Sequence, residues 1–150
     1  KILFNYRECI EKGLIRKTTP SKDKAIRSLK SSHIWLKEAE KNYSNNALRS
    51  SLLSAYLAVF HAARSILFFD GYREKSHACL ARYLEENYVK KGLLETKWVE
   101  LLDHYRDLRH TSQYSFNFFP SEEEIKEAIE KSKKFVERMD MLLQQKLRDV

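Results

Sequence analysis

Apolar residues recur at steps of three and four through most of this chain, which is the spacing of one face of an α-helix. Over residues 22–43 the stripe consists of Ala25, Leu29, Ser32, Leu36, Ala39 and Tyr43. Residues 47–70 are apolar around most of the helical circumference, as in the central helix of a bundle. Further helical segments are predicted over residues 76–89, 96–114 and 120–147. The pattern therefore predicts an all-α protein, an antiparallel up-and-down bundle of four to five helices.

Turn and capping residues divide these segments. A short amphipathic helix is predicted over residues 4–14, and a linker runs from its end to residue 20. The segment Ser44–Asn46 is expected to form a turn and to supply the N-cap of the central helix. Ser121 and Glu124 have the spacing of a capping box at the start of the last helix. We predict one domain over residues 1–150.

Composition supports helices and locates the charge. Three glycines and two prolines are too few for a sheet protein with many tight turns. The net charge is +7; residues 1–50 contain twelve Lys/Arg and five Asp/Glu, whereas residues 51–150 contain sixteen of each. The whole excess therefore lies in the first third of the chain. A basic face can attract nucleic acid, and a solvated lysine-rich helix is the simpler alternative.

Two features bear on location. Cys9 and Cys79 have no metal-like or redox-like spacing, so we interpret them as cysteines of a reducing, cytoplasmic environment. Residues 51–69 are long and apolar enough to span a bilayer. His61 and Arg64 lie near the middle of this segment, where a charge costs about 2.5–3.5 kcal/mol on insertion scales. A buried central helix explains the segment better, and no membrane association is predicted.

Metal and cofactor chemistry receives little support. Glu74 with His77, and Asp107 with His110, have the carboxylate-x-x-His spacing of di-iron bundles. Such sites also need inward glutamates from two more helices, and residues 47–69 contain no acid. Phosphate loops and nucleophile elbows are missing from the sequence as well. We predict neither a metal nor a cofactor.

The helical wheel of residues 97–114 singles out one arginine. At 100° per residue, Arg109 falls within the apolar stripe of this helix, Arg106 and Gln113 fall on its border, and His110 falls outside it. A guanidinium among apolar residues needs a partner or a water-filled cleft, because an unpaired buried charge is costly. Two interpretations stay open. In one, Arg109 bonds an acid or backbone carbonyls between helices, together with Gln113 one turn further along its own helix. In the other, it lines a cleft and binds phosphate.

The segment SAYLAVFHAARSILFFDGYREKSH, followed by a helix, a glycine-containing loop and a helix ending RHTSQY, resembles HEPN domains. The resemblance is to the small stand-alone archaeal and bacterial branch and covers about residues 22–145. The matching positions are Ala55, Tyr56, Ala58, Phe60, His61, Ala62, Ala63, Arg64, Gly71, Ser76 and His77.

The resemblance implies a dimerising bundle, often beside a nucleotidyltransferase partner. Many HEPN domains are metal-independent ribonucleases, whose motif is Arg, four to six residues, then His. Here four residues follow Arg109 and the next is Tyr114, while only three residues separate Arg106 from His110. The ribonuclease motif is therefore incomplete, and the general acid or base that RNA cleavage needs is missing or displaced.

We therefore predict a cytoplasmic homodimer that binds nucleotide or RNA, or a nucleotidyltransferase partner, rather than an enzyme. In this hypothesis Arg109 and Arg106 hold phosphate, and Tyr114, Gln113 and His110 contact the nucleotide or support the arginines. The resemblance adds His61, Arg64 and His77 as further candidates. One alternative is a toxin-type ribonuclease that uses Arg106, Arg109 and His110 across a dimer cleft. Another is a structural partner protein in which Arg109 only ties helices together.

Overall fold

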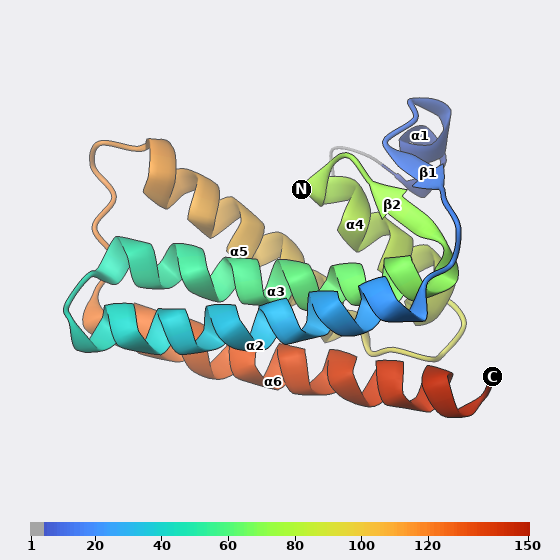
Figure 1. The fold of residues 1–150 in the computed structure, drawn as a ribbon. Coiled ribbons are helices and arrows are strands. Elements are labelled where there is room, and N and C mark those ends of the chain that lie inside the picture. Colours follow the sequence, from blue (N-terminus) through green and yellow to red (C-terminus); the bar gives the residue numbers. More distant parts are fainter. Residues whose placement is uncertain (1–4) are drawn as a thin grey trace.

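A computed structural model describes residues 5–150 of the chain (Figure 1). In chain order the elements are α1 (Tyr6–Glu11), β1 (Ile15–Lys17), α2 (Lys22–Ser44), α3 (Leu48–Asp70), β2 (Tyr72–Glu74), α4 (His77–Leu84), the π-helical turn η1 (Glu85–Val89), α5 (Thr96–Tyr114) and α6 (Glu122–Arg148). The long helices α2, α3 and α6 lie side by side, and α5 crosses them obliquely (Figure 1). The predicted all-α bundle is confirmed.

Helix α3 is the centre of the bundle because its small residues let neighbouring helices approach closely. Ala58, Ala62 and Ala63 are fully buried, and thirteen of the 23 residues of α3 are buried altogether. Buried serines tie α3 to α2: Ser28 Oγ donates to the carbonyl of His61, and Ser51 Oγ donates to the carbonyl of Ala39. The polar groups in this interface are thus hydrogen-bonded, as burial requires.

The membrane alternative fails on burial. In the part of the chain that the structure describes, α3 alone has the length and hydropathy to cross a bilayer, and 67% of its most apolar window is buried inside the protein. It is the core helix that its sequence predicted.

Capping predictions are partly right. The capping box of Ser121 and Glu124 forms at the start of α6. The turn at residues 44–46 also forms, but the N-cap of α3 is Ala47, which makes no side-chain capping bond. The prediction that this turn supplies the N-cap is therefore wrong. The helix begins instead where its apolar side chains can pack against α2 and α6.

Residues 5–20 contain more regular structure than the predicted helix and linker. Phe4, where the predicted helix begins, lies outside the described residues. The linker contains β1, which pairs antiparallel with β2 so that Arg16 stands opposite Arg73. This strand pair was not predicted. It fits because Gly71 adopts a φ of 84°, and a Cβ there would lie 2.7 Å from Pro20.

A disulfide joins Cys9 of α1 to Cys79 of α4 across 70 residues, with an S–S distance of 2.09 Å. Both cysteines are fully buried. The interpretation of these residues as marks of a reducing environment is therefore wrong, because disulfides are rare in reducing compartments. Their distance along the sequence concealed the pairing. The cytoplasmic location itself stays a prediction.

Candidate functional site

Arg109 projects from α5 onto the aromatic face of α3. Its guanidinium carbon lies 4.9 Å from the centre of the Tyr56 ring, and its Nη1 donates to Gln113 Oε1 at 2.9 Å. Its Nε is buried and has no acceptor within residues 5–150. The bond to Gln113 belongs to the first of the two open interpretations, but it lies within α5 and joins no second helix. Arg109 also lines a small hollow of about 210 Å³ with Arg49 and Ser112. It therefore both bonds a neighbouring side chain and forms part of a cleft wall.

Tyr56 joins this arginine to His77 at the start of α4. The Tyr56 hydroxyl and His77 Nδ1 share a hydrogen bond of 2.7 Å, and Tyr56 itself is only 1% exposed. The His77 ring stacks on Phe60 with 4.1 Å between centroids. We call Tyr56, His77, Arg106 and Arg109 the Arg109 cluster. Three helices, α3, α4 and α5, supply it.

Arg106 reaches the cluster as the outer member of a chain of charges. Arg82, which is only 3% exposed, donates from Nη2 to Asp103 Oδ2 at 2.6 Å. Arg106 Nη1 lies 3.4 Å from Asp103 Oδ1. The geometry of the second contact leaves Arg106 Nη1 without a hydrogen bond inside the described part of the chain. Asp103 therefore contacts both guanidinium groups, and Arg106 also contacts the exposed Asp107 at 3.3 Å. Arg109 is the cation of the cluster that has no ion pair with a carboxylate within the described residues.

The cluster shifts the pKa of both uncharged members. Burial raises the pKa of the Tyr56 hydroxyl to about 12, although Arg109 and Arg106 oppose the shift. Burial, followed by the charges of Arg109, Arg64 and Arg106, lowers the pKa of His77 to about 4. At neutral pH the hydroxyl is protonated and the imidazole is neutral, so both can form hydrogen bonds while the two arginines carry the charge.

The depressed His77 pKa predicts a fall in stability on acidification. Between the ordinary histidine pKa of about 6.5 and the folded-state pKa of about 4, the unfolded chain binds more protons at this position. Stability should therefore fall as pH drops through this window, and the contribution should level off below it. His77→Gln should flatten that part of the profile. The measurement is the melting temperature of both proteins between pH 7.5 and pH 4; parallel profiles would contradict the assignment.

Two of the remaining candidates lie beside the cluster on α3. Arg64 Nε donates to Glu74 Oε1 at 2.9 Å, and its guanidinium lies 5.1 Å from the centre of the Phe60 ring. Burial raises the pKa of Glu74, and Arg64 counteracts that shift. His61 is half-buried with its ring edge-on to Phe60, and burial lowers its pKa.

His110 and Tyr114 point elsewhere. Both are exposed, and their rings contact each other with centroids 4.8 Å apart. The structure therefore brings together Arg109, Arg106, Gln113 and His77, while His110 and Tyr114 form a separate pair near the end of α5. The roles proposed for these residues stay predictions.

Tyr56 is the member of the cluster to which the sequence analysis gave no role beyond its place in the family resemblance. Its spacing contained the signal. Tyr56, Phe60 and Arg64 recur at steps of four along α3, so they form one polar-edged aromatic row on a helix that is otherwise apolar. That row is the face on which His77 and Arg109 converge.

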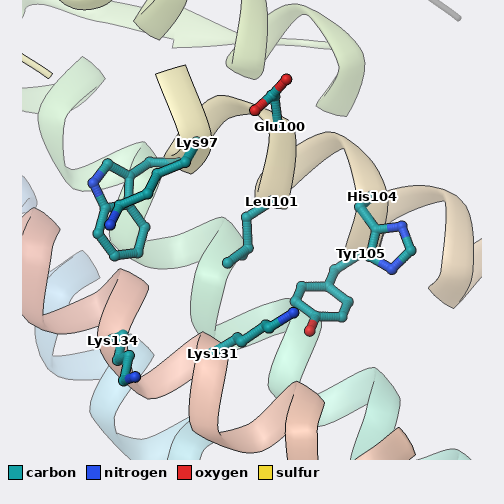
Figure 2. Close-up of a pocket in the computed structure, with 8 residues that line it drawn as sticks. Lys97, Glu100, Leu101, His104, Tyr105, Lys131 and Lys134 are labelled. Carbon is teal, nitrogen blue, oxygen red and sulfur yellow. The ribbon is translucent and has the colours of Figure 1, made fainter. Parts of the chain in front are cut away.

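A second hollow, of about 440 Å³, lies between α5 and α6 (Figure 2). Lys131 extends from α6 toward Tyr105 of α5 (Figure 2). It also pairs with Glu127 at 2.6 Å. Lys97 lies over the Trp98 ring. The residues predicted from the sequence line other parts of the molecule, and we place the candidate site at the Arg109 cluster.

Metal ligands do not gather in the described structure: within residues 5–150 no group of three His, Cys, Asp or Glu side chains could hold an ion.

Comparison with known proteins gives a consistent result. A family model described as "HEPN domain" matches residues 25–142. A protein of Methanocaldococcus jannaschii named "Putative toxin" is 26% identical over 103 residues, which are 69% of this chain and 76% of that protein. A UPF0332 protein of Pyrococcus horikoshii is 32% identical over 62 residues, which are 41% of this chain and 44% of that protein.

Proposed function

Because the chain belongs to the HEPN domain family, we propose that it binds RNA and that the Arg109 cluster holds phosphate groups of the strand. One observation carries the proposal: Arg109 lines a hollow and contacts the uncharged side chains of Gln113 and Tyr56, and no carboxylate pairs with its guanidinium within the described residues. A partly buried guanidinium without a counter-charge is costly, and a phosphate in the hollow would supply one through charge-assisted hydrogen bonds.

The neighbours of Arg109 suit the same ligand. Arg106 adds a second guanidinium, which contacts Asp103, shared with Arg82, and the exposed Asp107. His77 is neutral at pH 7, so it would contribute a hydrogen bond to a phosphate rather than a charge. Binding of an anion beside His77 would raise its pKa, because an opposite charge favours the protonated form.

Arg109→Gln should weaken binding of single-stranded RNA about ten- to a hundredfold. The basis is that hydrogen bonds to a charged group contribute about 1.5–3 kcal/mol, and 1.4 kcal/mol is a factor of ten. The salt dependence of binding should also become shallower, by about 0.7 in the logarithmic slope. Fluorescence anisotropy of a labelled oligoribonucleotide measures both quantities.

Arg27→Gln is the matched control for this experiment. Arg27 is an exposed arginine of α2 in an ion pair with Asp23, so the variant loses the same charge away from the cluster. The proposal is wrong if the two variants bind RNA equally well, or if Arg109→Gln lowers only the melting temperature. The latter result would mean that Arg109 is a structural tie between helices.

RNA cleavage without a metal is the second candidate function. The observation that favours it is that the fold brings His77, from a different helix, to the tyrosine beneath Arg109, so a histidine adjoins the arginine although the sequence motif lacks one. A pKa of about 4 makes His77 a weak general base near pH 7, which is why binding is the first choice. Degradation of RNA in EDTA that is lost in both His77→Ala and Arg109→Gln would reverse this order.

We also propose that the chain forms a homodimer and works beside a nucleotidyltransferase partner. The support is three exposed aromatic side chains at the end of α5 and in the loop that follows it: Phe116, Phe119 and Tyr114 are 94%, 77% and 66% exposed. Exposed apolar patches of this kind mark interaction sites. Sedimentation of the purified chain, alone and with the partner enzyme, tests both proposals. A monomer that stays separate from that enzyme would contradict them.

A further inference from the structure

The two-stranded sheet forms one wall of a basic hollow that the sequence did not reveal. We call this hollow the sheet cleft. It measures about 730 Å³ and lies between the β1–β2 pair, the middle of α3 and the first residue of α4. Its cations are Arg16, Lys17, Arg64, Arg73 and Lys75. Glu74 is the carboxylate of its lining, and that group is already paired with Arg64 at 2.9 Å. Positive charge therefore greatly exceeds negative charge around the hollow.

The register of the two strands places two of these positive charges side by side, which is electrostatically unfavourable. Arg16 and Arg73 stand directly opposite each other in the antiparallel pair, and like charges in that position destabilise a sheet. Arg16 is held by a hydrogen bond from its Nε to the carbonyl of Gly13 at 3.1 Å. Both arginines are exposed at the mouth of the cleft. An anion between the two guanidinium groups would attract both of them and offset this repulsion.

The sheet is firmly attached to the bundle, so the cleft is a built feature. Backbone bonds from Thr18 to Gly71 and from Lys75 to Leu14, both 2.8 Å, extend the pairing at its two ends. The disulfide between Cys9 and Cys79 holds the preceding helix against α4. Residues 5–20, which supply β1, precede residues 25–142, over which the family model matches.

The sheet cleft and the Arg109 cluster share one residue, His77. His77 lines the cleft and is also hydrogen-bonded to Tyr56, over which Arg109 lies. A polyanion seated at Arg109 could therefore continue past His77 into the hollow. A single phosphate cannot occupy both places, whereas a strand with regularly spaced phosphates can.

We infer that the sheet cleft is a second phosphate-binding subsite, which makes a single-stranded polynucleotide the ligand of this protein in preference to a mononucleotide. The inference rests on the proposed RNA binding at the Arg109 cluster. The strand would run from Arg109 and Arg106, past His77, to the cations of β1 and β2.

The double variant Arg73→Gln/Lys75→Gln tests this subsite, because both side chains are exposed and their replacement leaves the core intact. Binding of an oligouridylate of about ten nucleotides should weaken about tenfold, and its logarithmic salt slope should fall by about 1.4, or 0.7 for each lost contact. Binding of uridine monophosphate, measured by competition or calorimetry, should stay unchanged. Arg109→Gln should weaken both ligands.

Lys24→Gln/Lys30→Gln is the charge-matched control, since it removes two exposed lysines from α2. Three results would overturn the inference. Arg73→Gln/Lys75→Gln binds the oligonucleotide like wild type, it binds it like the lysine control, or its affinity for both ligands falls equally. If Arg109→Gln still weakens binding in any of these cases, RNA binding at the cluster stands and only the second subsite is refuted. If wild type binds neither ligand, both proposals are wrong.

Discussion

Asp103→Ala should lower the free energy of unfolding by about 3 kcal/mol, at the lower end of the range for breaking a buried ion pair. The reason is the position of Arg82, whose side chain is 4% exposed and depends on Asp103 at 2.6 Å. Its other carboxylate contact, Glu85, lies 3.4 Å away and is one-third exposed, so it compensates only in part. The variant would leave a buried guanidinium with too little negative charge beside it.

Thermal unfolding measures the effect, and Asp107→Ala supplies the control on the same helix. A loss of about 3 kcal/mol corresponds to a melting temperature lower by about 6–12 °C for a chain of this size. Asp107 contacts Arg106 at 3.3 Å, but its side chain is 70% exposed, so its removal should cost about 0.5 kcal/mol or less. Equal melting temperatures for the two variants would show that Arg82 does not rely on Asp103.

Reduction of the Cys9–Cys79 disulfide should destabilise the protein by up to about 4 kcal/mol. The bond closes a loop of about 70 residues that contains α2 and α3, and cross-linking so long a loop removes much of the entropy of the unfolded chain. Urea unfolding with and without a phosphine reductant measures the difference. The corresponding fall in melting temperature is about 8–16 °C.

The control for reduction is the double variant Cys9→Ala/Cys79→Ala. Alanine is preferable to serine because both positions are fully buried, and a serine hydroxyl there would need a partner. The double variant should resemble the reduced wild type and should not respond to reductant. Identical unfolding of oxidised and reduced wild type would refute the prediction. Hydrogen exchange in residues 5–20 should also rise on reduction, since the disulfide holds α1 against α4.

Both experiments concern the functional site as well as stability. Asp103 positions Arg106 in the Arg109 cluster, and the disulfide attaches the segment that contributes Arg16 and Lys17 to the sheet cleft. Loss of either should therefore weaken RNA binding under conditions in which the bundle is still folded. The scaffold and the proposed binding surface share these contacts.

Local patterns were sufficient for the helices. The stripe of Ala25, Leu29, Ser32, Leu36 and Ala39 is buried as expected, and the capping box at Ser121 starts α6. Helical periodicity and capping depend on residues within one or two turns of each other, so they are legible in the sequence. The wheel also placed Arg109 toward the apolar side of its helix, because that direction is a property of α5 alone.

Only the tertiary structure decided which side chains meet. Arg109 lies on Tyr56, Tyr56 bonds His77, and Cys9 bonds Cys79 because three helices and a strand pair cross at particular places. Those crossings depend on the packing of whole helix faces, to which residues far apart in the sequence contribute together. His110, by contrast, falls outside the apolar stripe on the wheel of α5, and its exposed ring lies against Tyr114. The sequence by itself determined the helices and the direction of each side chain on its own helix; the packing between helices determined the site.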